Sequence, residues 1–165
     1  MRYFILTLLF SIRAVSAIEP IFANVGSELL VTVHFNADSC FTSSRYLFEM
    51  SKDKDALDVA VYKGHYTEQH SELYTKLATI QLTDKQIKGL DKLLKRYREL
   101  PPCDSTSTNT IKIEWNRPFM SGGKRIGVST PLVETIYVDQ LTEEEKKDFF
   151  TFSDVAKVAE TQKKK

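Results

Sequence analysis

The chain has 165 residues, of which 42% are hydrophobic and 27% are charged, with a formal net charge of +1. This composition is typical of a globular protein and excludes an intrinsically disordered chain. A nearly neutral domain lacks the broad positive field of nucleic-acid-binding proteins, so we expect no nucleic-acid partner.

The first seventeen residues have the layout of a signal peptide. Arg2 gives a basic start, an apolar run covers residues 4–10, and Val15-Ser16-Ala17 supplies the small side chains that signal peptidase accepts. The run is too short to serve as a permanent transmembrane anchor. Arg13, between the apolar run and the cleavage site, is atypical of such peptides.

We therefore expect cleavage after Ala17 and a periplasmic or extracellular protein without a stable membrane anchor. The predicted organisation is a signal peptide over residues 1–17, one domain over 18–160 and a flexible basic tail over 161–165. Removing Arg2 and Arg13 leaves 21 basic and 22 acidic residues, a net charge of −1.

Cys40 and Cys103 are the only cysteines. Two thiols in an oxidising compartment predict one disulfide, which would contribute roughly 4 kcal/mol by the chain-entropy model. A metal-binding pair or a catalytic thiol would need a CxxC spacing or a neighbouring histidine, and the sequence has neither.

In the first half of the domain, apolar and polar residues alternate with the period of a half-buried strand. A polar, charged turn over Ser51–Asp55 separates two of the predicted strands. For the last strand, a helical stripe through Leu73, Leu77 and Ile80 is an alternative. The four predicted strands are Glu28–Asn36, Arg45–Met50, Asp58–Gly64 and Tyr74–Leu82.

The clearest helix is predicted to start at Thr83. The Thr83 hydroxyl and the Gln86 side chain can form a capping box, and Leu82 can pack on Ile87. Pro101-Pro102 ends the helix. Its apolar stripe consists of Ile87, Leu90, Leu93, Leu94, Tyr97 and Leu100.

The second half of the domain repeats the pattern of strands followed by a helix. A strand is predicted over Ile111–Trp115, a hairpin loop over Arg117–Lys124, and further strands over Arg125–Thr130 and Val133–Asp139. Short connections favour antiparallel pairing. We therefore expect an α+β fold, with an antiparallel sheet of about six or seven strands and two helices packed on it.

The last helix should start at a second capping box, formed by Thr142 and Glu145. Phe149, Phe150 and Phe152 are its expected apolar anchors, and the last dozen residues are expected to fray.

The histidines and acidic clusters match no common metal site. His65 and His70 lie five residues apart in a polar loop with Glu68 and Glu72, a spacing that zinc sites do not use. We interpret this loop as solvated and His34 as a surface or hairpin-contact residue. We expect neither a metal nor a cofactor.

Asp53, Asp55 and Asp58 lack the glycine and the terminal glutamate of an EF-hand loop, so they predict an acidic turn.

Motifs for nucleophilic catalysis are also weak. Ser51–Lys54 and Ser121–Lys124 both spell SxxK, but they fall in predicted turns and the companion motifs are absent. Scattered catalytic groups remain an alternative, namely a hydrolase of envelope polymers that uses His34, His65 or His70 with carboxylates. We expect a binding protein rather than an enzyme.

The strongest local signal is the predicted hairpin loop. Phe119 and Met120 stand beside the cations Arg117, Lys124 and Arg125, a composition typical of protein-contact hot spots. The alternative is a loop that folds back and buries Phe119 on its own domain. The sequence favours a small exported protein-binding module, such as an inhibitor, immunity protein or envelope accessory protein, that occupies a partner with an acidic surface.

Overall fold

The computed structural model describes residues 20–26, 29–38, 43–53, 56–66, 72–100 and 108–163. The predicted signal peptide, both cysteines, Glu68 and His70 lie outside the described residues. The elements are β1 Leu30–Asp38, β2 Ser43–Asp53, β3 Ala56–Tyr66, β4 Glu72–Leu82, α1 Asp84–Glu99, β5 Thr110–Asn116, β6 Pro118–Ser121, β7 Lys124–Val128, β8 Leu132–Tyr137, the 3-10 turn η1 Val138–Gln140, α2 Glu143–Phe149 and α3 Thr151–Lys163.

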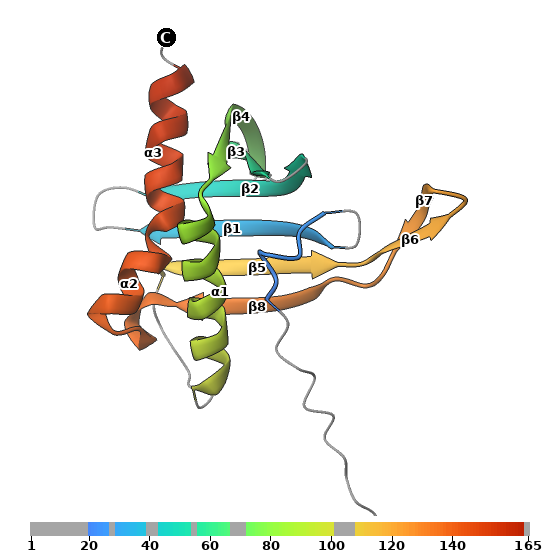
Figure 1. Ribbon diagram of the computed structural model, residues 1–165. Helices are drawn as coiled ribbons and strands as arrows, with labels where there is room; N and C mark the ends of the chain where they lie inside the picture. The colour runs from blue at the N-terminus through green and yellow to red at the C-terminus, as the bar shows by residue number, and fades with distance from the viewer. Residues whose placement is uncertain are drawn as a thin grey trace, which may run out of the picture.

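The fold is α+β, as the sequence predicted. Six antiparallel strands form the main sheet in the order β4-β3-β2-β1-β5-β8, and β6 and β7 form a separate two-stranded sheet (Figure 1). The segment Tyr74–Leu82, for which a helix was the alternative, belongs to strand β4.

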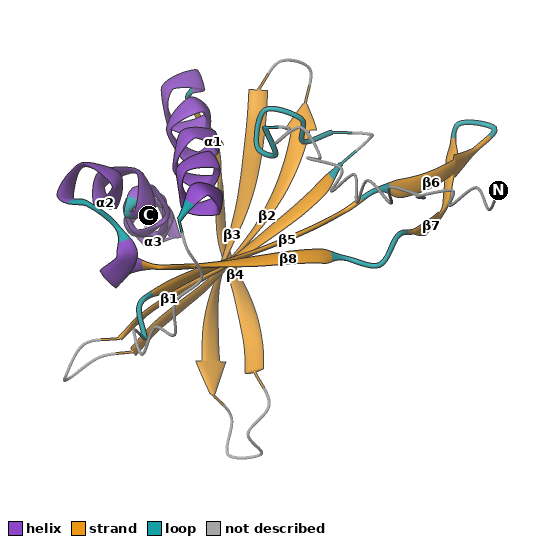
Figure 2. Cartoon of the chain, turned by 90° about the horizontal axis from the view of Figure 1, so that it is seen from below, coloured by secondary structure: helices purple, strands orange, loops and turns teal. Residues whose placement is uncertain are grey.

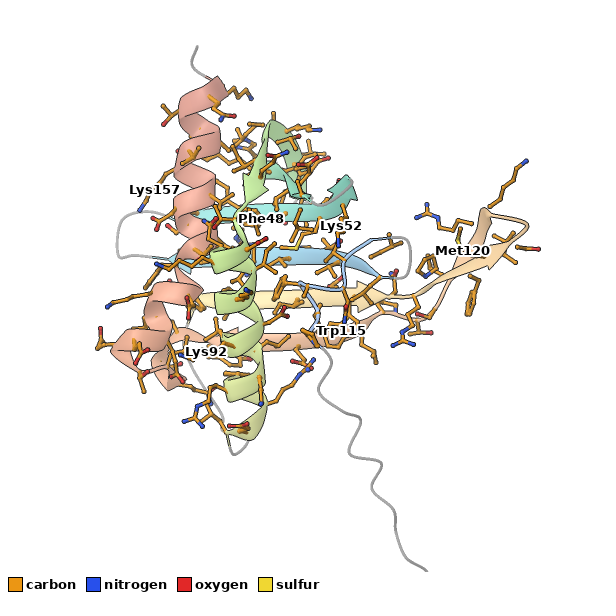
Figure 3. All side chains as sticks on the ribbon, in the orientation of Figure 1. Phe48, Lys52, Lys92, Trp115, Met120 and Lys157 are labelled. Carbon is orange, nitrogen blue, oxygen red and sulfur yellow. The ribbon has the colours of Figure 1, made fainter. Side chains whose placement is uncertain are left out.

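The helices lie together on one face of the main sheet, and the hydrophobic core fills the space between the helices and the sheet (Figure 2). The strands bury every second residue on the face toward the helices, and Phe48 of β2 is among the fully buried side chains there (Figure 3). None of the helices among the described residues has the length and apolar character needed to span a bilayer.

The first helix is built as its sequence predicted. The Thr83 Oγ1 accepts the Gln86 backbone N–H at 3.3 Å, and the Gln86 Oε1 accepts the Thr83 N–H at 2.9 Å. Leu100 is the C-terminal cap residue. The helix buries Leu90, Leu93 and Leu94 of its predicted stripe.

The second predicted helix is divided into α2 and α3 at Phe150. Phe149 and Phe152 are buried, whereas Phe150 is 39% exposed. The prediction that all three phenylalanines anchor the helix is therefore wrong for Phe150. The rings of Phe149 and Phe152 pack against those of Phe35 and Phe48 on the sheet, at 5.8 and 5.0 Å, whereas Phe150 is the cap residue at which the two helices meet.

Helix α3 continues through Lys163, so the expected fraying of the last dozen residues is wrong up to that residue. Its inner face buries Val155, Ala156 and Ala159. The Glu160 Oε1 accepts a hydrogen bond from the Tyr46 hydroxyl at 2.9 Å and one from the Lys63 Nζ at 2.6 Å. These contacts hold the C-terminal part of the helix on β2 and β3.

The described segment before β1, residues 20–26, is here called the N-terminal segment and is held against α1. The carboxylate of Asp91 accepts the backbone N–H groups of Phe22 at 2.9 Å and Ala23 at 3.0 Å. Burial raises the pKa of Asp91, and the two N–H donors partly oppose that shift. The Phe22 ring lies 6.2 Å from that of Phe152. The N-terminal segment is thereby fixed beside the end of the sheet.

Candidate functional site: the arm and the cleft at its base

Residues 117–128 form a β-hairpin, here called the arm, that projects beyond the end of β5 and β8 (Figures 1 and 2). Gly122 and Gly123 connect its strands with φ angles of 56° and 76°. Positive φ at both central residues is what a type I′ hairpin turn requires, and glycine adopts it without strain. The segment predicted as a loop is therefore mostly paired strand.

The arm continues the strand pair formed by β5 and β8. Where the main sheet ends, the Ser129 N–H donates to the Arg117 carbonyl and the Arg117 N–H donates to the Ser129 Oγ, both at 2.9 Å. These two bonds close the ribbon at its base. The arm is thus attached through two paired strands rather than through a single flexible connection.

The strand register separates the apolar side chains of the arm onto two faces. Pro118 pairs with Val128, and Phe119 pairs with Gly127. The ring of Phe119 lies over Gly127, because a Cβ added there would be 3.5 Å from the ring. Met120, two residues after Pro118, lies on the face of Val128. Ile126 is the residue left unpaired where the register shifts between Phe119 and Met120.

All four large apolar side chains of the arm are exposed. The exposed fractions are 56% for Phe119, 50% for Met120, 71% for Ile126 and 47% for Val128. The alternative in which the loop folds back and buries Phe119 is therefore wrong. The sequence analysis did not identify Ile126 and Val128 as candidate binding residues. They lie two residues apart in a predicted strand that no predicted element covers, and this spacing could have identified them.

All the charged residues of the arm are basic. Arg117, Lys124 and Arg125 carry its charges, and residues 117–133 contain no aspartate or glutamate. Among the residues that the structure describes, Lys124 and Arg125 form no ion pair. The five predicted binding residues therefore lie on one small hairpin that combines exposed apolar groups with positive charge.

A cleft of about 740 Å³, here called the base cleft, lies where the arm joins the main sheet. Figure 3 shows Trp115 at the end of β5, on the way to the arm that carries Met120. The base cleft lies between the N-terminal segment, the C-terminal end of α1 and the strands β5 and β8. Its lining includes Ile21, Leu29, Arg98, Trp115, Leu132 and Glu134.

Arg98 shapes the base cleft. Its Nε lies 2.7 and 2.9 Å from the two carboxylate oxygens of Glu134, and its guanidinium carbon lies 5.6 Å from the centre of the Trp115 ring. A planar guanidinium can hold a carboxylate and face an aromatic ring at once. Sequence reasoning missed this cluster because its members are far apart in the chain and follow no motif.

The histidines are distributed over other parts of the molecule. The His34 Nε2 lies 3.8 Å from the Glu114 Oε1, on the sheet face without helices, and Lys112 contacts the same carboxylate at 2.5 Å. The hydrogen bond from Lys112 lowers the pKa of Glu114. His65 is exposed in β3. No group of three or more potential metal ligands occurs among the described residues.

The described aspartates, serines and lysines of the acidic cluster and of the SxxK strings belong to paired strands, whereas Lys54 and Asp55 lie outside the described residues. Asp53 pairs with Ala56 and Asp58 pairs with Ser51, so the prediction of a turn is wrong for Ser51 and Asp53, which belong to β2, and for Asp58, which belongs to β3. Ser121 pairs with Lys124 across the exposed tip of the arm. This pair is not on a buried helix, which the SxxK chemistry requires.

Comparisons of the chain with protein-family models, with curated proteins and with solved structures found no match.

Proposed function

We propose that the protein is a small exported protein-binding module, such as an inhibitor, immunity protein or envelope accessory protein, that acts by occupying a partner. The observation that carries this proposal is the arm, on which Phe119, Met120, Ile126 and Val128 are all exposed beside cations. Clustered apolar exposure of this kind typically marks an interaction surface.

The physical properties of the arm suit docking. A paired ribbon closed at its base has little backbone freedom to lose on binding, so two good anchors could supply most of the affinity. The arm carries three cations and no carboxylate, which favours a partner with an acidic surface. Association should then be faster at low salt.

We further propose cleavage after Ala17 and a Cys40–Cys103 disulfide in the mature protein. Asn36 of β1 pairs with Thr110 of β5. Cys40 follows Asn36 by four residues and Cys103 precedes Thr110 by seven. The segments that connect the sheet to the two cysteines therefore start from neighbouring positions in β1 and β5. Intact-mass measurement of the exported protein tests the cleavage, since a soluble product that retains Met1 would contradict it. Two alkylatable thiols in protein from its native compartment would contradict the disulfide.

The arm is tested by replacing Arg117 and Phe119 with alanine. A photo-cross-linking side chain at Ile126 first identifies the partner in the native compartment, and that partner is then purified. We expect the Arg117→Ala, Phe119→Ala protein to bind the purified partner at least about 30-fold more weakly, or roughly 2 kcal/mol, with an unchanged fold.

The control removes an exposed leucine and an exposed lysine elsewhere. Leu73→Ala with Lys85→Ala takes away the same kinds of group on β4 and α1, and its affinity should be unchanged. Equal binding by both double variants would remove the arm from the interface. Turnover of a substrate by the purified protein would instead favour the enzyme class.

A further inference from the structure

The main sheet has two edge strands, β4 and β8, and the elements and side chains around these two strands differ. Helix α3 packs against β4, and β4 also carries the exposed cation Lys76. Covering elements and lysines are common devices that prevent a sheet edge from pairing with another chain. Among the described strands, β8 pairs with β5 alone.

The hydrogen-bond pattern shows which backbone groups the outer edge of β8 offers. The Val138 N–H donates to the Asn109 carbonyl at 3.1 Å, next to the first β5–β8 pair. In an antiparallel ladder, every second residue turns both its N–H and its C=O toward the neighbouring strand. Counting back from Val138, the residues that face away from β5 include Thr135 and Val133.

The side chains of β8 leave this edge unprotected. Leu132 is 61% exposed and Val133 is 47% exposed. The only charged residue of the strand is Glu134, which is held by Arg98 on the helix side. Pro131 lacks a backbone N–H and therefore ends the pairing edge on the side of the arm.

We propose that the outer edge of β8, Leu132–Tyr137, accepts an extended acidic segment of the partner protein as an additional strand. Strand addition obtains affinity from backbone hydrogen bonds and specificity from alternate side chains. An apolar side chain of the segment would lie against Leu132 and Trp115 in the base cleft. Its carboxylates would reach the basic stretch of residues 117–125. This inference rests on the proposed function, which supplies the partner.

Trp115 makes the proposal directly measurable. It is the only tryptophan of the chain and pairs with Leu132, so its fluorescence reports on the start of β8. The probe is a synthetic peptide in which valine alternates with glutamate. Three analogues are tested beside it. In one, lysine replaces glutamate. In the other two, methyl groups block the backbone N–H groups of either the valines or the glutamates.

We expect saturable binding of the acidic peptide and at least tenfold weaker binding of the lysine analogue and of the one N-methyl analogue whose methyl groups face β8, because an added strand turns only every second N–H toward its neighbour. Equal binding of all four peptides, or no change in Trp115 fluorescence with any of them, would overturn the proposal. The N-methyl analogues alter the probe alone, so this comparison does not depend on the folding of a variant.

The matched variants are Thr135→Pro and Thr135→Val. Proline removes the outward N–H of an edge strand while the bonds toward β5 remain, and valine preserves both the shape and the N–H. We expect the proline variant to bind the acidic peptide at least tenfold more weakly and the valine variant to bind it as the wild type does. Equal peptide binding by the proline variant would contradict strand addition.

Self-association provides a further check. A wild-type dimer that Thr135→Pro abolishes would overturn the proposal, because a second copy would then occupy the edge. The arm variants described above separate this inference from the proposed function. If Thr135→Pro leaves the identified partner bound and the arm variant does not, strand addition fails and the binding function stands.

Discussion

Removal of the Phe152 ring should show how strongly α3 is held on the sheet. The ring is 1% exposed and lies 5.0 Å from the ring of Phe48 and 6.2 Å from that of Phe22. Phe152→Ala would therefore leave a cavity where strand, helix and N-terminal segment meet.

The expected loss is about 3–5 kcal/mol of unfolding free energy, the range for a buried phenylalanine truncated to alanine. This is a large part of the roughly 5–15 kcal/mol that stabilises a typical domain. At roughly 2–4 °C per kcal/mol for a chain of this size, Tm should fall by about 6–20 °C.

Phe150 provides the matched control, since it lies two residues away and is 39% exposed. Its ring contacts the Phe149 ring at 5.2 Å, so Phe150→Ala should cost about 1 kcal/mol. Chemical denaturation followed by Trp115 fluorescence measures both variants. Similar losses for the two would refute the packing of α3 through Phe152.

Two further predictions concern other clusters. Burial and the hydrogen bond to Glu160 raise the pKa of Tyr46 from 10.0 to about 12. The folded protein therefore keeps a proton that the unfolded chain loses above pH 10, so Tyr46 should make stability fall between about pH 10 and 12. Denaturation at these pH values should show a smaller fall in unfolding free energy for the Tyr46→Phe variant than for the wild type. Arg98→Ala should cost about 1–3 kcal/mol and Arg98→Lys should recover only part of it, because the lysine ammonium lacks the planar, rigid fork that meets both oxygens of Glu134 and faces the Trp115 ring. Urea titration of both variants checks this, and full recovery with lysine would contradict the bidentate contact.

Features that depend on neighbours in sequence were predictable from the sequence. The capping boxes at Thr83 and Thr142 use a partner three residues away, and both are present. The alternation of apolar residues in the strands follows from the two-residue period of the pleat, so the α+β class and the buried faces could be inferred. The composition of the arm and its Gly122-Gly123 turn are likewise local.

The tertiary structure determines which side chains are covered by other elements and which remain exposed. Whether Phe119 is buried or exposed depends on whether another element covers the arm, and hydrophobicity alone does not specify that. The bond between Asp91 and the N-terminal segment and the cluster around Arg98 join groups that come together only when the sheet and α1 assemble. The outward groups of β8 follow from its position at the sheet edge, because strand order is set by packing of the whole chain rather than by the period of any one strand.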